Sequence, residues 1–209
     1  MCGIIGYTGS EDVREVLLDA LELLEYRGYD SAGIALRDEE SGKTEVRKCA
    51  GRVSDLRAIC ASEKVVSQCG IGHTRWATHG GVNDCNAHPH QVGKVTLVHN
   101  GIIENYRELI ADYDLADTLK SETDSEVVAA LLNRFYEGNP EEAIKKTVSK
   151  LKGTFALVIL FEDQKDVIYS TRNVSPIVAT ICKEGAMLAS DLTALCRFTN
   201  RYFVRSEER

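Results

Sequence analysis

Phe155-Ala156-Leu157-Val158-Ile159-Leu160-Phe161 is the longest apolar run of this 209-residue chain. Seven residues are far too few to span a bilayer, so the run predicts no membrane segment. A strand that is apolar at successive positions is typical of a strand covered on both faces. We therefore expect a buried strand at 155–162, with a layer of structure on each side of it.

Four further short segments follow this run and are rich in β-branched or aromatic residues, which predicts strands at 167–171, 177–182, 187–189 and 202–204. The connections between them are too short for helical crossovers. The pairing should therefore be mostly antiparallel.

The part of the chain before this run alternates between helical and extended patterns. Apolar residues from Val13 to Leu24 recur three and four apart, which predicts an amphipathic helix with Ser10 as its N-cap. Further helices are expected from Ser54 to about 62, from near Ile102, from 121–124 and from Asn139-Pro140, and strands at 2–7, 33–37, 44–48, 70–76 and 95–99. The expected fold is one α+β domain over residues 1–209, with two packed sheets between layers of helices.

The composition is that of an ordinary globular protein, with 44% hydrophobic and 27% charged residues. A formal charge of −7 and the absence of a Lys/Arg cluster argue against nucleic acid as a partner. Seven cysteines without a CxxC pair suit reduced thiols in the cytoplasm. The N-terminus also lacks the basic start and long apolar core of a signal peptide.

Cys2 directly follows Met1, and a small side chain at this position favours removal of the initiator methionine. We expect Cys2 to become the N-terminal residue, with a thiol of ordinary pKa about 8.5 and an α-amine of about 7.7–8.0. The amine can then take the thiol proton near neutral pH and leave a nucleophilic thiolate. The alternative is that Cys2 is a small buried hydrophobic residue that opens an edge strand.

Four polar clusters lie where a predicted strand ends or a helix begins, which is where a scaffold normally presents reactive groups. They are Arg27-Gly-Tyr-Asp30, His73-Thr-Arg-Trp-Ala-Thr-His-Gly80, His99-Asn-Gly101 and Thr123-Asp124. An Arg and an Asp at such positions could clamp the carboxylate and the ammonium group of an α-amino acid. Asn100 and the Gly101 N–H could form a two-donor oxyanion hole.

Structural explanations compete with these roles. Asn100-Gly101 is also a strong signal for a tight turn, Trp76 could be a core residue, and Asp124 could cap the helix that follows it. Cys85, His88 and His90 form a CxxHxH string that could bind zinc. No fourth ligand stands at a recognisable spacing, so we expect no metal.

Together these segments resemble the glutaminase domain of the class II, or N-terminal-nucleophile, glutamine amidotransferases. The resemblance is carried by Cys2-Gly-Ile-Ile-Gly6, Leu24-Glu-Tyr-Arg-Gly-Tyr-Asp-Ser-Ala-Gly33, His73-Thr-Arg-Trp-Ala-Thr-His-Gly80, Asn86-Ala-His-Pro-His90, His99-Asn-Gly-Ile-Ile-Glu-Asn105 and Ser121-Glu-Thr-Asp124. The Tyr-Arg-Gly-Tyr-Asp-Ser and Thr-Arg-Trp-Ala-Thr-His strings favour the branch that makes glucosamine 6-phosphate from fructose 6-phosphate. They distinguish it from the amidophosphoribosyltransferase and asparagine synthetase branches.

The resemblance implies a four-layer α/β/β/α sandwich of two antiparallel sheets, the N-terminal-nucleophile hydrolase fold, with no cofactor. It implies that Cys2 attacks the side-chain amide of glutamine to form a γ-glutamyl thioester. Ammonia leaves first, and water then releases glutamate. Asn100 and the Gly101 N–H would hold the oxyanion of the tetrahedral intermediate.

The resemblance also assigns substrate contacts. Arg75 would bind the α-carboxylate of glutamine and Asp124 its α-ammonium group. Trp76, Thr78 and His79 would line the pocket, and Arg27 would shape the site around Cys2.

The chain departs from the family in three places. Family members continue into two sugar-isomerase domains, which this chain lacks and which are its expected partners beside L-glutamine. The full-length protein is expected to be a dimer through those domains, and the fragment a monomer. Loop 80–84 lacks the usual Pro of the family, and Val174 stands where the family commonly has Gly.

Two alternatives stay open. The ammonia could serve a different acceptor in another class II amidotransferase. If Met1 is retained, the nitrogen of residue 2 is an amide without a basic lone pair, and the domain would bind glutamine without catalysis.

Overall fold

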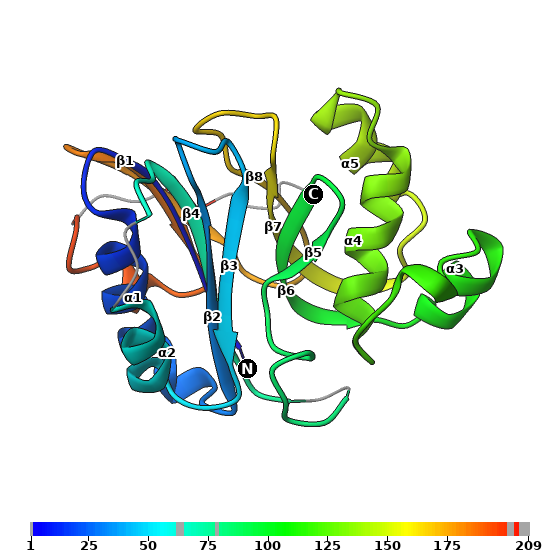
Figure 1. Cartoon of the computed structure of the whole chain (residues 1–209), viewed down its shortest axis with the longest axis horizontal. Helices are drawn as coiled ribbons and strands as arrows, with labels where there is room; N and C mark the ends of the chain where they lie inside the picture. The colour runs from blue at the N-terminus through cyan, green and yellow to red at the C-terminus, as the bar shows by residue number, and fades with distance from the viewer. Residues whose placement is uncertain (1, 62–64, 78–79, 200–202, 205–209) are drawn as a thin grey trace.

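The computed structural model describes residues 2–61, 65–77, 80–199 and 203–204, and it places them in four layers (Figure 1). Helices α1 and α2 form one outer layer, and α3, α4 and α5 form the other. Two antiparallel sheets lie between them. This is the expected α+β sandwich, and the expected antiparallel pairing is confirmed.

The first sheet has seven strands in the order β11-β9-β10-β1-β4-β2-β3. Its strands are β1 (Gly3–Gly9), β2 (Ser31–Arg37), β3 (Thr44–Cys49), β4 (Cys69–Arg75), β9 (Val178–Cys182), β10 (Gly185–Ala189) and β11 (Phe203–Val204). Strand β1 lies between β10 and β4, so the segment that begins at Cys2 runs through the middle of the sheet.

The second sheet has four strands in the order β5-β6-β7-β8. They are β5 (His90–Val92), β6 (Val95–Ile103), β7 (Gly153–Phe161) and β8 (Tyr169–Asn173). The apolar run that starts at Phe155 therefore forms most of β7, an inner strand with β6 and β8 on its two sides.

The α-helices are α1 (Val13–Leu24), α2 (Val53–Cys60), α3 (Tyr106–Asp112), α4 (Asp124–Phe135) and α5 (Pro140–Val148). Short 3-10 turns lie at Glu25–Arg27, Ala116–Thr118 and Leu192–Ala194. The side chain of Asn139 caps α5 by accepting the backbone N–H of Glu142 at 3.2 Å, as the Asn-Pro pair predicts.

Alternate residues of β7 pack into two different cores. Leu157, Ile159 and Phe161 pack against the α4 side, whereas Val158 and Leu160 face the other sheet. All five side chains are at most 2% exposed. The prediction that this strand is covered on both faces is confirmed, and each such side chain contributes about 1.5–3 kcal/mol by burial.

Three local predictions were wrong. The N-cap of α1 is Asp12, whose carboxylate accepts the N–H groups of Arg14 and Glu15, and not Ser10. Helix α2 begins at Val53, so Ser54 lies inside its first turn. The helix expected from near Ile102 is α3, which begins only at Tyr106 because β6 continues to Ile103 in pairing with β7.

Within the part of the chain that the structure describes, no helix has both the length and the apolar character needed to cross a membrane.

Candidate active site

Cys2 lies immediately before β1, with its thiol against the end of β4. Its Sγ accepts the backbone N–H of Trp76 at 3.2 Å and lies 3.6 Å from the Trp76 carbonyl oxygen. Burial raises the pKa of the Cys2 thiol above its ordinary value, and the Trp76 N–H and the positive Arg75 and Arg27 oppose that rise. The thiol therefore needs a base before it becomes a nucleophile.

The backbone carbonyl of Cys2 is held from two directions. Arg27 donates its Nε–H to this oxygen at 3.2 Å, and Asn100 donates its Nδ2–H at 3.0 Å. The guanidinium of Arg27 also bonds Asp191 at 2.6 Å, and this ion pair joins the segment after α1 to the chain beyond β10. Arg27 thus lies beside Cys2, as expected, but on its backbone and not on the wall of the cavity.

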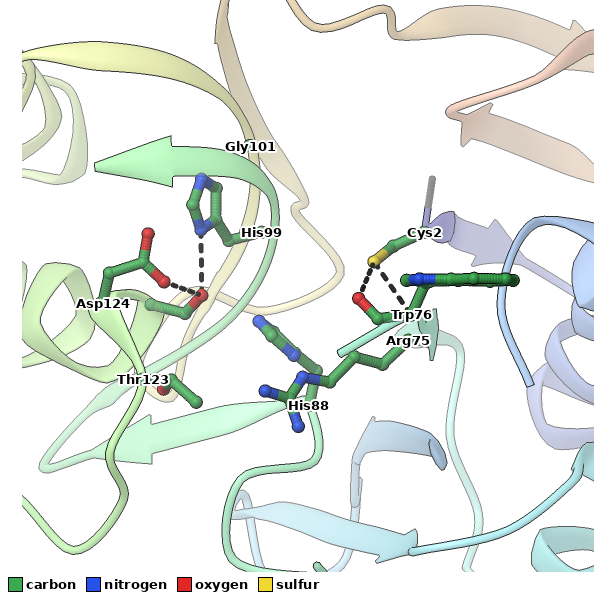
Figure 2. A pocket seen from close by; sticks show the side chains of 9 residues that line it. Cys2, Arg75, Trp76, His88, His99, Gly101, Thr123 and Asp124 are labelled. Atoms are coloured by element: carbon green, nitrogen blue, oxygen red, sulfur yellow. Dashed lines mark hydrogen bonds between the residues drawn. The ribbon is translucent and has the colours of Figure 1, made fainter. Parts of the chain in front are cut away.

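A small cavity of about 30 Å³ opens beside the Cys2 thiol (Figure 2). Its walls come from both sheets and from the start of α4; they are formed by Cys2, Arg75, Trp76, His88, His99, Gly101, Thr123, Asp124 and Ser125. Five of the residues predicted for the site, Cys2, Arg75, Trp76, Gly101 and Asp124, are therefore brought together.

Arg75 and Asp124 bring opposite charges to this cavity. Their residues are only 4% and 5% exposed, and Figure 2 shows Arg75 extending from the Cys2 side toward His88. The Arg75 guanidinium donates to the carbonyl oxygens of Gly81 at 3.2 Å and Gly80 at 3.5 Å. A buried cation and a buried anion on one small cavity suit a zwitterionic ligand.

Asp124 is the first residue of α4, and Thr123 is the N-cap. One Asp124 oxygen accepts the N–H of Ile103 at 2.8 Å, and the other accepts the Ser125 hydroxyl at 3.4 Å. The carboxylate is thus anchored to the end of β6. It also lies at the helix N-terminus, where a negative charge is favourable.

Asn100 and Gly101 lie within β6 and do not form a turn. Gly101 has φ +137°, and a Cβ at this position would lie 2.0 Å from the Thr154 carbonyl oxygen on β7. Only glycine fits this backbone. The alternative expectation, a tight turn at Asn100-Gly101, was wrong.

The chain matches a family model described as "Glutamine amidotransferase domain" over residues 77–197, which is more than half of its length. The chain belongs to the glutamine amidotransferase family. Among curated proteins, it is 48% identical to the glutamine–fructose-6-phosphate aminotransferase (isomerizing) of Bacillus licheniformis over 97% of this chain and 34% of that protein. The same enzyme of Bacillus subtilis is 46% identical over the same shares. The chain thus spans about a third of the length of these relatives.

Solved amidotransferase structures share its fold. The glutamine phosphoribosylpyrophosphate amidotransferase of B. subtilis, with ADP and GMP, superimposes with a TM-score of 0.79 at 26% identity, covering 93% of this chain and 43% of that one. A structure of the allosteric regulatory enzyme of purine biosynthesis gives 0.84 at 26% identity, covering 97% and 44%. The N-terminal-nucleophile sandwich expected of this glutamine amidotransferase is therefore confirmed.

Four buried histidines were not predicted as part of this amidotransferase site. His73, His88, His90 and His99 are 1–5% exposed. Burial lowers the pKa of each, that of His73 to about 3, so that all four are neutral near pH 7. In the sequence, all four lie within the motif segments, and His88 and His90 also belong to the CxxHxH string.

Three of the four histidine rings contact one another next to the cavity. His73 and His88 are 4.1 Å apart between ring centroids and nearly parallel, and His90 meets His88 edge-on at 4.6 Å. His90 Nε2 lies 3.0 Å from the hydroxyl of Thr123, and His99 Nδ1 lies 2.9 Å from that of Ser125. Among the described residues, neither ring nitrogen of His88 has a hydrogen-bond partner.

The Cys85, His88 and His90 string does not converge on one point. The thiol of Cys85 donates to the Lys120 carbonyl oxygen at 3.1 Å, away from the stacked imidazoles. Within the ranges that the structure covers, no three His, Cys, Asp or Glu side chains are placed to share a metal ion. Thr78 and His79, predicted to line the pocket, lie outside the described residues.

Proposed function

We propose that this domain hydrolyses L-glutamine to glutamate and ammonia, with Cys2 as the nucleophile. The observation that carries the proposal is the single cavity on which the Cys2 thiol, the Arg75 guanidinium and the Asp124 carboxylate all lie. Arg75 binds the α-carboxylate of glutamine and Asp124 its α-ammonium group, which directs the side-chain amide toward Cys2.

Catalysis needs a base at Cys2, and the α-amine of a processed N-terminus supplies it. The amine takes the thiol proton, and Sγ forms a bond to the amide carbon of glutamine. The Asn100 Nδ2–H and the Gly101 N–H hold the resulting oxyanion. The proton then passes to the leaving nitrogen, the C–N bond breaks, and ammonia departs from a thioester. Water hydrolyses the thioester, which restores the thiol and releases glutamate.

Glutamine requires the cavity to open. A volume of about 30 Å³ holds no more than a few water molecules. Trp76 is 47% exposed, whereas Arg75 and Asp124 are almost fully buried, so the wall on the Trp76 side is the one that faces solvent. The Trp76 side chain would move outward, while Arg75 and Asp124 stay in place.

The acceptor is fructose 6-phosphate in a longer protein, which continues into sugar-isomerase domains and dimerises through them. The acceptor and the further domains of this proposal are supported by the names of the curated relatives and by their threefold greater length. Sequence beyond Arg209 decides it, because a sugar-isomerase region is required there and a different acceptor domain would contradict it.

The test of the hydrolase pairs an activity assay with a mass measurement. The purified chain should lack the mass of one methionine, should release glutamate from glutamine, and should be labelled at Cys2 by an electrophilic glutamine analogue. Cys2→Ala should abolish turnover and labelling. Cys196→Ala, at an exposed cysteine outside the cavity, is the matched control and should retain both. A processed chain with neither turnover nor labelling would contradict the proposal.

A further inference from the structure

We infer that His73 is a positioning residue that fixes which end of the Asn100 side-chain amide faces Cys2. The inference rests on the proposed function, because it concerns the donor offered to the oxyanion. His73 lies on β4 of the seven-stranded sheet and Asn100 on β6 of the other sheet, so their contact joins the two layers.

The surroundings of His73 determine its tautomer. Its Nε2 is 3.1 Å from the backbone oxygen of His99 and 3.1 Å from Oδ1 of Asn100. A backbone carbonyl oxygen can only accept a hydrogen bond, so Nε2 must carry the hydrogen. His73 therefore donates from Nε2.

The tautomer in turn determines the orientation of the Asn100 amide. An Nε2–H group needs an acceptor, and on the Asn100 side chain only the oxygen accepts. The other end of the amide lies 3.0 Å from the carbonyl oxygen of Cys2, again a pure acceptor, which requires the nitrogen there. Two independent acceptors, at His99 and Cys2, thus give the same orientation, with the N–H groups on the Cys2 side.

The opposite tautomer of His73 would remove the hydrogen-bond donor from the Cys2 side of Asn100. With the hydrogen on Nδ1, the His73 Nε2 would accept, and the Asn100 amide would turn its nitrogen toward His73. Its oxygen would then face the Cys2 carbonyl and any oxyanion formed beside it, replacing a donor by a repelling acceptor. Burial keeps His73 neutral with its pKa at about 3, so protonation does not change this arrangement near neutral pH.

His73 could instead be only a buried packing residue, and the two roles make different predictions. His73→Gln keeps an N–H donor near the position of Nε2, whereas His73→Met fills the space without a donor. We expect His73→Met to lower kcat for glutamate release about 10- to 100-fold, up to the lower end of the roughly 100- to 1000-fold range for complete loss of an oxyanion donor, with KM changed less than about threefold. His73→Gln should stay within about fivefold of the unmodified chain.

A double-mutant cycle tests whether His73 acts through Asn100. Asn100→Ala alone should lower kcat, and adding His73→Met should change it by less than about twofold further. Equal losses in His73→Gln and His73→Met, an unaltered kcat in His73→Met, or multiplying effects in the double variant would each overturn the inference.

The tautomer can also be measured without any substitution, which keeps the test valid if a variant fails to fold. Long-range ¹⁵N–¹H correlation spectra of the unmodified chain should show His73 with its hydrogen on Nε2, and a hydrogen on Nδ1 would overturn the inference. If the unmodified, processed chain releases no glutamate, the proposed function fails, and the spectrum still decides the tautomer.

Discussion

Acid should destabilise this fold before its carboxylates titrate, and replacing His73 by Gln should remove part of that effect. Burial lowers the pKa of folded His73 from 6.5 to about 3, so between these values the unfolded chain binds the proton and the folded chain does not. Above pH 6.5 the protonation of His73 therefore costs the fold no stability. The free energy of unfolding then falls progressively as the pH drops from 6.5 toward 3.

The size of the effect follows from the two pKa values. At pH 5 protonation of this one imidazole favours the unfolded chain by about 2 kcal/mol, and at pH 3, where folded His73 is half protonated, by about 4 kcal/mol. Burial lowers the pKa of His88, His90 and His99 as well. The unmodified chain should therefore lose more free energy of unfolding in acid than His73 alone accounts for.

Urea unfolding followed by circular dichroism at pH 7, 6 and 5 measures this loss. His73→Gln has no group that titrates in this range, so its free energy of unfolding should fall about 2 kcal/mol less between pH 7 and pH 5 than that of the unmodified chain. Parallel pH dependence of the two proteins would refute the reasoning, because His73 would then be accessible to protons in the folded state.

Three further substitutions test single contacts. Gly101→Ala should lower the free energy of unfolding by about 3 kcal/mol, since φ +137° and the nearby Thr154 oxygen leave no room for a Cβ; an unchanged denaturation midpoint would contradict this. Val174→Gly should stabilise the fold by about 1 kcal/mol and raise its melting temperature by about 2–4 °C, because an exposed β-branched residue is strained at φ +70°; a lower melting temperature would count against it. Arg75→Lys should raise KM for glutamine at least about tenfold and affect kcat less, because the ammonium group cannot pair bidentately with a carboxylate; an equal KM would exclude Arg75 as the carboxylate ligand.

Much of the architecture could be predicted from the sequence, because the spacing of apolar residues distinguishes helices from strands. The spacing from Val13 to Leu24 predicted the buried face of α1, and the apolar run in β7 predicted a strand covered on both faces. The failures came where two local signals of similar strength compete. Ser10 and Asp12 are both good caps, and only Asp12 lies directly before the first helical turn.

Asn100-Gly101 shows why local propensity can fail. The dipeptide favours a turn in isolation, but nine consecutive residue pairs between β6 and β7 carry the strand through it. The positive φ of Gly101, which a turn would also use, here lets β6 approach the Thr154 carbonyl. Pairing with a strand about fifty residues away is not visible in a local pattern.

The buried histidines could not be predicted as a group for a similar reason. His73 and His99 lie on strands of different sheets, and His88 comes from the loop before β5, so only the docking of the sheets brings their rings together. In the sequence, His88 and His90 were visible chiefly as candidates for a zinc site. Burial, which decides their protonation, is not encoded at a single position.

The cavity takes Cys2 and Arg75 from the ends of strands in one sheet, and Gly101 and Asp124 from the other sheet and its helix. A buried apolar layer between the sheets keeps these groups around one cavity; it consists of Ile4, Ile71, Val98, Val158 and Leu160. Each sheet could keep all its strands and yet offer no complete site if the two sheets shifted relative to each other. Catalysis in this domain therefore depends on how the two sheets pack against each other, and the turnover rate reports on that packing.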